Sequence, residues 1–152
     1  MAAVPSDFDP NKAENLEDIE KQFAVVAVEY AETYWTLLEK IGGRNLRLTP
    51  IDDEIYADLL ETFPEFQQGV EAGKCIDENV MKSKLGKDKW NKFASRYEKR
   101  VNDFNFGSLL RIRSDEGLTH DNTIFSFRVQ TMAIEIFRNR HGLNDWVYKG
   151  NK

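Results

Sequence analysis

The chain has 152 residues, of which 41% are hydrophobic, 12% aromatic and 31% charged, and its formal net charge is −5. This length corresponds to one domain in the simplest case, and the apolar content excludes an intrinsically disordered chain. The single cysteine, Cys75, excludes an internal disulfide. We expect a soluble protein of the cytoplasm, with the nucleus as a second location, because the N-terminus lacks the features of a signal peptide and no apolar run is long enough to span a membrane.

Charge is distributed unevenly along the chain. Residues 1–65 contain 5 Lys or Arg and 15 Asp or Glu, whereas residues 66–152 contain 16 and 11, respectively. Such asymmetry can mark a basic surface that binds acidic partners. The alternative, which we favour, is that the two halves fold together and partly neutralise each other.

The N-terminal residues predict an arm that precedes the folded domain. Residues 1–14 contain two prolines and show no hydrophobic periodicity, which is typical of a flexible terminus. We therefore expect a flexible N-terminal arm over residues 1–14 and a single helical domain over residues 15–152.

A long helix is predicted over residues 16–41. Asn15 and Asp18 form a weak capping box at its start, and Gly42 follows its last turn. Its apolar residues recur in steps of three and four, as one face of an α-helix requires. They form two adjacent stripes: Leu16, Ile19, Phe23, Val26, Tyr30, Tyr34, Leu37 and Ile41, and Ala24, Val28, Ala31, Trp35 and Leu38. This apolar arc is wider than one partner helix needs, and a helix of roughly 40 Å spans a domain of this size, so we expect it to be central.

Three further long helices are predicted from capping residues and hydrophobic spacing. They are expected over residues 50–63, 84–105 and 126–141. Thr49 followed by Pro50 favours the start of the first, and Ser83 caps the second. Asp77 is expected to cap a short turn before the helix at residues 84–105, and an aromatic tail of Trp146, Val147 and Tyr148 is expected to pack back onto the body.

These elements predict an all-α, mainly helical fold in one compact domain around the long helix. We allow for one short β pairing, of residues 46–48 with residues 124–125. We find no internal sequence repeat, so a repeat architecture is not expected.

The sequence contains no recognisable catalytic or cofactor-binding motif. The stretch Gly69 to Cys75 resembles a phosphate-binding loop, but it is one residue short and has Cys75 where a Ser or Thr would hold magnesium. The two histidines, His120 and His141, do not form a metal-ligand set. We therefore expect no cofactor, no metal and no enzymatic activity.

Basic and polar residues in the second half are candidates for partner binding. Residues 82–113 contain 10 Lys or Arg, which suggests nucleic-acid binding, but no nucleic-acid motif accompanies them and a solvated helix face is the favoured interpretation. Arginine is well suited to bidentate contacts. The residues that we expect at an interface, or alternatively in a buried polar clamp, are Arg111, Arg113, Asn122, Arg128, Gln130, Arg138, Asn139 and Arg140.

Four stretches resemble the eukaryotic polysaccharide biosynthesis domain-containing protein 1 family, and its fungal members most closely. They are NLEDIEKQFAVV at residues 15–26, DDEIY at 52–56, DFNFG at 103–107 and AIEIFRNRHG at 133–142. The resemblance extends over nearly the whole chain after the first dozen residues. It implies a dedicated chaperone that binds the GTPase domain of translation elongation factor 1-alpha as this domain emerges from the ribosome.

From this implied function we hypothesise a mechanism that needs no ATP. An apolar groove along the helix at residues 16–41, with arginines at its rim, would shield the incomplete GTPase domain until GTP binding closes that domain and lowers its affinity. We expect a monomer that contacts no membrane and no specific nucleic acid, with the ribosome or nascent-chain factors as further partners. The alternatives are an enzyme or accessory protein of polysaccharide biosynthesis, as the family label suggests, and an RNA-binding adaptor.

Overall fold

The computed structural model describes the backbone of residues 16–150 and the side chains of residues 24–150. The predicted arm over residues 1–14 and the capping box of Asn15 and Asp18 lie outside the described residues. Within the described part the chain is mainly helical. Its helices are α1 (Leu16–Ile41), α2 (Asp52–Thr62), α3 (Glu71–Lys74), α4 (Glu78–Met81), α5 (Lys84–Ser95) and α6 (Arg128–Arg140), and its two strands are β1 (Gly107–Arg111) and β2 (Thr123–Phe127).

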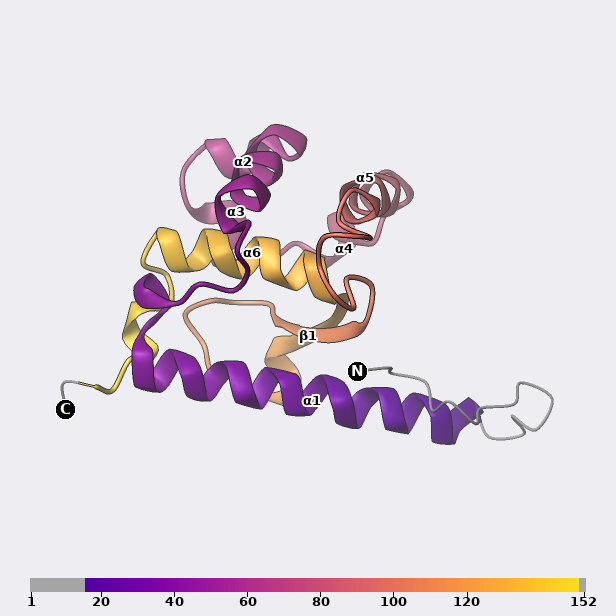
Figure 1. Ribbon diagram of the computed structural model, residues 1–152, viewed down its shortest axis with the longest axis horizontal. Coiled ribbons are helices and arrows are strands. Elements are labelled where there is room, and N and C mark those ends of the chain that lie inside the picture. The colour runs from indigo at the N-terminus through magenta and orange to yellow at the C-terminus, as the bar shows by residue number, and fades with distance from the viewer. Residues whose placement is uncertain (1–15, 151–152) are drawn as a thin grey trace.

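The elements form layers on either side of α6. Figure 1 shows α1 along one side of the molecule, with β1 between α1 and α6, and with α2, α3, α4 and α5 on the opposite side of α6. Helix α1 packs mainly on β1, whereas α6 contacts α2, α3, α5 and both strands. No helix of the described residues is long and apolar enough to cross a membrane.

Helix α6, rather than the long helix, lies at the centre of the fold. Nine of its 13 residues are buried. The predicted bounds of the long helix are confirmed, but its predicted central position is not: among its described side chains only Ala27, Ala31 and Leu38 are buried. Two of these three residues are alanines, whose small side chains allow α1 to lie close to β1. The rest of its wide apolar arc stays partly open, and Leu37 is 39% exposed.

Helix α5 ends ten residues earlier than predicted. After Ser95 the backbone tightens, because the amides of Arg96 and Tyr97 bond to carbonyls three residues back instead of four. Asp103 then adopts a left-handed conformation with φ of 58°, and the chain turns towards β1. Tyr97 and Val101 are nevertheless buried, so the predicted inner face is correct although the helix that carries it is shorter.

Helix α2 begins at Asp52, two residues later than predicted, because the Thr49–Pro50 segment forms a separate turn. The Asp52 carboxylate accepts hydrogen bonds from the amides of Leu48 (2.8 Å) and Thr49 (2.7 Å), and the Thr49 hydroxyl accepts one from Ile51 (3.0 Å). The predicted caps Asp77 and Ser83 are confirmed, since their side chains accept hydrogen bonds from the amides of Val80 and Gly86, respectively.

The predicted β pairing has the wrong partner. Ile124 and Phe125 belong to β2, which pairs antiparallel with β1 so that they lie opposite Leu110 and Leu109. The connection between the strands is closed by Ile112, whose amide bonds to the Asn122 carbonyl at 2.7 Å. Because β2 continues to Phe127, α6 begins two residues later than predicted, at Arg128.

An aromatic core joins α2, α5 and α6. The rings of Phe63 and Trp90 stack at 4.2 Å, and Phe66 lies edge-on to Phe137 at 4.9 Å. The aromatic tail packs as predicted: Val147 is buried, and the amide of Lys149 bonds to the Glu39 carbonyl of α1 at 2.8 Å.

Candidate functional site: a buried polar network and two open grooves

Arg138 lies at the centre of a buried polar network near the C-terminal end of α6. Its Nε donates to the Gly73 carbonyl at 2.7 Å, and its Nη1 donates to Glu135 Oε2 at 2.7 Å. Its Nη2 donates to the carbonyls of Arg111 (2.8 Å) and Ile112 (3.2 Å). The side chain is fully buried, and all three of its nitrogens have acceptors. Arg138 therefore ties α6 to α3 and to the end of β1.

Arg111 is a second buried cation of the network. It donates to the Ser114 carbonyl at 2.9 Å and to Asn144 Oδ1, and its Nη2 lies 3.6 Å from Glu135 Oε1. Its guanidinium lies 5.1 Å from the centroid of the Trp35 ring of α1. A buried ion pair is tolerated only when hydrogen bonds satisfy both partners, and this one meets that condition.

Asparagine side chains extend the network to α1 and to the C-terminal segment. Asn144 donates to Glu135 Oε1 (3.0 Å) and to Asn139 Oδ1 (2.7 Å). Asn139 in turn donates to the Tyr34 hydroxyl at 2.9 Å. A Cβ atom at Gly43 would lie 2.3 Å from Asn139 Oδ1, so the turn after α1 needs a glycine there. The network thus fixes the position of α1 relative to α6.

The network sets the ionisation of its own members. Burial raises the pKa of Glu135, but the charges of Arg138 and Arg111 outweigh burial and hold this pKa below its usual value. Burial raises the pKa of Tyr34 well above its ordinary value, and the charge of Glu135 adds to this effect. At neutral pH Glu135 is therefore an anion and Tyr34 a neutral hydroxyl.

Five of the eight predicted partner-binding residues are buried and hydrogen-bonded within the protein. They are Arg111, Asn122, Gln130, Arg138 and Asn139. Arg111, Arg138 and Asn139 belong to the polar network, and Asn122 lies in the connection between the strands. The amide of Phe127 donates to Gln130 Oε1 at 3.4 Å. For these residues the alternative of a buried polar clamp holds, and we remove them from the candidate surface.

Three predicted residues remain accessible, and two of these have anionic partners. Arg113 pairs with Asp115 at 2.9 Å, and Arg140 pairs with Asp53 at 2.5 Å. In each pair the arginine lowers the pKa of the carboxyl group, mainly through a hydrogen bond. Arg128 is partly buried and has no ion pair with any described residue.

Arg128 lines an open groove between α1, β1 and α6, which we call the Arg128 groove. Its volume is ≈ 300 Å³, at the lower end of the range of about 300–1,000 Å³ that is usual for ligand pockets. Its walls are largely apolar, and Leu37 of α1 is exposed along one of them. The lining residues are Tyr30, Ala31, Thr33, Tyr34, Leu37, Leu48, Phe106, Gly107, Ser108, Leu109, Arg128, Thr131, Met132 and Glu135.

Within this groove the guanidinium of Arg128 is only partly satisfied. It lies 4.9 Å from the centroid of the Tyr30 ring. Its Nε atom is shielded from solvent and has no hydrogen-bond partner, which is true of no other buried side-chain nitrogen or oxygen among the described residues. A buried donor without an acceptor is rare in native proteins and calls for an explanation.

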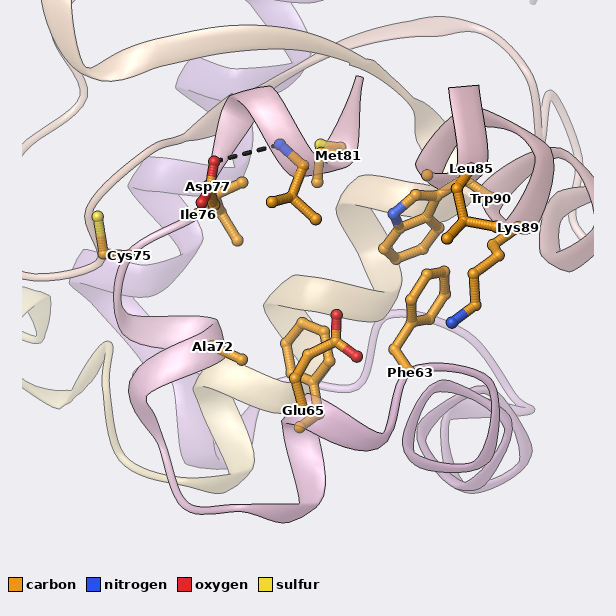
Figure 2. A pocket seen from close by; sticks show the side chains of 13 residues that line it. Phe63, Glu65, Ala72, Cys75, Ile76, Asp77, Met81, Leu85, Lys89 and Trp90 are labelled. Atoms are coloured by element: carbon orange, nitrogen blue, oxygen red, sulfur yellow. Dashed lines mark hydrogen bonds between the residues drawn. The ribbon is translucent and has the colours of Figure 1, made fainter. Parts of the chain in front are cut away.

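A second open groove, which we call the Trp90 groove, lies between α4, α5 and the segment after α2. Its volume is ≈ 400 Å³. Figure 2 shows Phe63, Trp90 and Lys89 close together on one side and Cys75 and Ile76 on the other. Its remaining lining residues are Glu65, Phe66, Ala72, Asp77, Val80, Met81, Leu85 and Gly86.

The polar groups of the Trp90 groove have roles within the fold. Asp77 caps α4 through the amide of Val80 at 3.2 Å, and the Lys89 ammonium lies 5.1 Å from the centroid of the Phe63 ring. A Cβ at Gly86 would lie 2.2 Å from the Val80 carbonyl, so α4 and α5 approach closely only because position 86 is a glycine.

The described residues contain no group of three or more His, Cys, Asp or Glu that could hold a metal ion. His141 bonds to the Tyr56 hydroxyl at 2.8 Å, and His120 is exposed beside Asp121. The stretch that resembled a phosphate-binding loop contains helix α3, in which a Cβ at Gly73 would lie 2.4 Å from the Phe137 ring. Close packing accounts for this glycine.

Known proteins similar to this chain share one family. A family model described as PBDC1 protein matches residues 19–149. A PBDC1 homolog of Saccharomyces cerevisiae is 51% identical over 142 residues, which cover 93% of this chain and 97% of that protein. A PBDC1 homolog of Schizosaccharomyces pombe is 52% identical over 142 residues, with 93% and 96% covered. The human protein PBDC1 is 40% identical over 131 residues, 86% of this chain and 54% of the human protein.

A solved structure has a similar fold. The solution NMR structure of a Saccharomyces cerevisiae protein is 51% identical to this chain and superposes with a TM-score of 0.82. The match covers 97% of this chain and 100% of the yeast chain.

Proposed function

The chain belongs to the PBDC1 family, and from this premise we propose that it is an ATP-independent chaperone of translation elongation factor 1-alpha. It binds the nascent GTPase domain of this factor and releases the domain when GTP drives its folding. It works by binding another protein and catalyses no reaction. It acts in the cytoplasm as a monomer, near the ribosome or factors that bind nascent chains.

The Arg128 groove is the observation that supports this proposal. A partly folded GTPase domain exposes apolar surface, and a protein that holds it needs an apolar surface of its own. Tyr30, Leu37 and Met132 provide such a surface in an open groove. The buried network around Arg138 keeps α1 and α6 at a fixed separation, so the groove has a defined shape before a client arrives.

The Arg128 groove is better suited to a client than the Trp90 groove. It combines an apolar wall with a cation that has no anionic partner among the described residues, and unpaired charge orients a client. Lys89 of the Trp90 groove packs on Phe63 much as Arg128 packs on Tyr30, but two carboxylates, Glu65 and Asp77, line the Trp90 groove as well.

Release follows from thermodynamic linkage. If the groove binds the open, nucleotide-free GTPase domain and GTP stabilises the closed domain, GTP binding must lower the affinity of the chaperone for this domain. The factor is the same as that by which the chaperone lowers the affinity of the domain for GTP. The chaperone needs no nucleotide site for this cycle. The nucleotide that drives release is bound by the client.

A binding experiment with a matched control tests the proposal. We would measure the Kd of the full chain for the isolated GTPase domain, nucleotide-free and GTP-loaded, by fluorescence anisotropy. Leu37→Asp places a charge in the Arg128 groove, and Leu85→Asp places the same charge in the Trp90 groove. We expect Leu37→Asp to weaken binding of the nucleotide-free domain about tenfold or more, because it removes an apolar contact and buries a charge. Leu85→Asp should leave the Kd unchanged.

Two outcomes contradict the proposal. Equal affinity for the nucleotide-free and GTP-loaded domains would exclude the release mechanism. Weakening by Leu85→Asp alone would move the client to the Trp90 groove.

The alternative functions have separate tests. An enzyme of polysaccharide biosynthesis must bind a donor or a metal, so a thermal-shift screen with nucleotide sugars, nucleotides, S-adenosylmethionine and divalent metals would show stoichiometric stabilisation by one of them. An RNA-binding adaptor would bind RNA with an affinity that falls steeply as salt rises. Under our proposal neither result is expected.

A further inference from the structure

The Arg128 guanidinium lacks a hydrogen-bond acceptor among the described residues. It is the first residue of α6, it lines the Arg128 groove, and its guanidinium stacks on Tyr30. A guanidinium has five N–H donors and no acceptor, so a ring face alone does not satisfy it. Its Nε has no acceptor among the described residues.

The carboxylate nearest to this task is already engaged. Glu135 lines the same groove, but its Oε2 accepts from Arg138 at 2.7 Å and its Oε1 accepts from Asn144 at 3.0 Å. The first turn of α6 contains no acidic residue, so the positive end of the helix dipole adds to the charge of Arg128. The groove is therefore apolar along its walls and electropositive at one point.

We propose that Arg128 is a carboxylate-binding subsite, so that the groove takes an apolar client segment that presents one Asp or Glu side chain to this guanidinium. The inference rests on the proposed client-binding function and specifies the chemistry of the bound segment. A carboxylate binds a guanidinium through two parallel N–H···O bonds. Because Nε is shielded from solvent in the free protein, the Arg128 side chain must rotate before Nε–H and one Nη–H can both reach such a ligand. The Tyr30 ring lies against one face of the guanidinium.

This subsite distinguishes the Arg128 groove from the Trp90 groove. A carboxylate in the Trp90 groove would meet Glu65 and Asp77, and these like charges would repel it. A carboxylate in the Arg128 groove meets an unpaired cation.

A double-mutant cycle tests the inference. Overlapping labelled peptides that tile the GTPase domain are titrated with the full chain, and the tightest-binding peptide is then remade with each Asp changed to Asn and each Glu to Gln. Each version is measured against the wild-type protein, Arg128→Gln, Arg128→Lys and the control Arg96→Gln, which removes an arginine that follows α5 and pairs with Asp58 of α2, outside the Arg128 groove.

We expect one amide substitution to weaken binding to the wild-type protein about ten- to a hundredfold, because it removes a charge-assisted bidentate contact. The same substitution should have no effect with Arg128→Gln. Arg128→Lys should recover part of the loss, since lysine keeps the charge but not the fork of donors. Arg96→Gln should behave like the wild type.

The outcomes separate this inference from the proposed function. If Leu37→Asp abolishes peptide binding while no amide substitution depends on Arg128, the carboxylate subsite is wrong and the client groove stands. If no peptide binds, or if binding is insensitive to Leu37→Asp, the carboxylate subsite is wrong, while the chaperone function is decided separately by the Kd of the whole GTPase domain.

Discussion

The two ends of α6 carry arginines of opposite kinds. Arg138 is fully buried and has acceptors for all three of its nitrogens, whereas Arg128, ten positions earlier, lines an open groove with one nitrogen unpartnered. A cation whose hydrogen bonds are complete stabilises the fold, and a cation that lacks an acceptor is available to a ligand. This difference separates a structural arginine from a candidate binding arginine on one helix.

The largest effect is expected from Arg138→Met. The change leaves Glu135 buried with only Arg111 to compensate it, and it leaves the carbonyls of Gly73 and Arg111 without their donor. We expect the free energy of unfolding to fall by about 3–5 kcal/mol. Urea denaturation followed by circular dichroism measures it.

Arg140→Met is the matched control for this variant. Arg140 lies on the same helix, but its ion pair with Asp53 is on the surface, so its loss should leave the free energy of unfolding nearly unchanged. Equal losses in the two variants would show that the buried network does not stabilise the fold more than a surface pair does.

A smaller loss is expected from Gly73→Ala at the same end of α6. The new Cβ would lie 2.4 Å from the Phe137 ring, and the carbonyl of residue 73 is an acceptor for Arg138. Overpacking of this kind costs about 1–3 kcal/mol. A Tm close to that of the wild type in a calorimetric scan would mean that α3 moves aside freely.

Acid should weaken the network through Glu135. Its pKa lies below the value of about 4.3 that it has in the unfolded chain, so its contribution to stability is complete above that pH and is lost as the pH falls through the folded-state pKa. We therefore expect the difference in unfolding free energy between the wild type and Glu135→Gln to shrink as the pH is lowered below about 5. A gap that is constant with pH would show that the pKa of Glu135 is unshifted.

The smallest effect on stability is expected at the other end of the helix. Arg128→Met loses the cation–π contact with Tyr30 but also removes the buried Nε that has no acceptor, so the free energy of unfolding should change by less than about 1 kcal/mol. Urea denaturation again provides the measurement. A loss as large as that of Arg138→Met would place Arg128 among the structural arginines and remove the contrast between the two ends.

Hydrophobic spacing was sufficient to predict most of the helices. The bounds of α1 were predicted from its stripes and its terminal glycines, and the inner face of α5 was predicted although the helix stops at Ser95. Helix α5 packs on α2 and α6, and local spacing does not contain tertiary contacts of this kind. The pairing of β2 with β1 was not predicted because it also depends on tertiary contacts. The connection between the two strands is closed by Asn122, whose side-chain oxygen accepts a hydrogen bond from the amide of Arg113.

The candidate site was harder to predict because a polar residue in an apolar helix has two possible roles. Arg138 and Asn139 follow Glu135 at spacings that suit either a surface or a buried cluster, and only the position of α6 between two layers decides between them. The one local signal was Glu135 three residues before Arg138, a spacing at which opposite charges on a helix can pair. Tyr34 gave no signal because its partner Asn139 is 105 positions away. Asn144 gave none because it lies after the end of α6, where helical spacing no longer relates it to Glu135 and Asn139.

The contact between Tyr34 and Asn139 joins residues 105 positions apart, and the amide of Lys149 bonds to Glu39 near the end of α1. Helix α1 therefore acquires these polar partners only after a segment more than 100 positions further along the chain has been made. Contacts this distant in sequence slow folding, because a long loop must close before they form. Removal of the residues after Gly142 should take away the bond from Lys149 to Glu39 and the contact of Asn144 with Asn139, so the position of α1 beside the Arg128 groove depends in part on a segment that is distant in sequence.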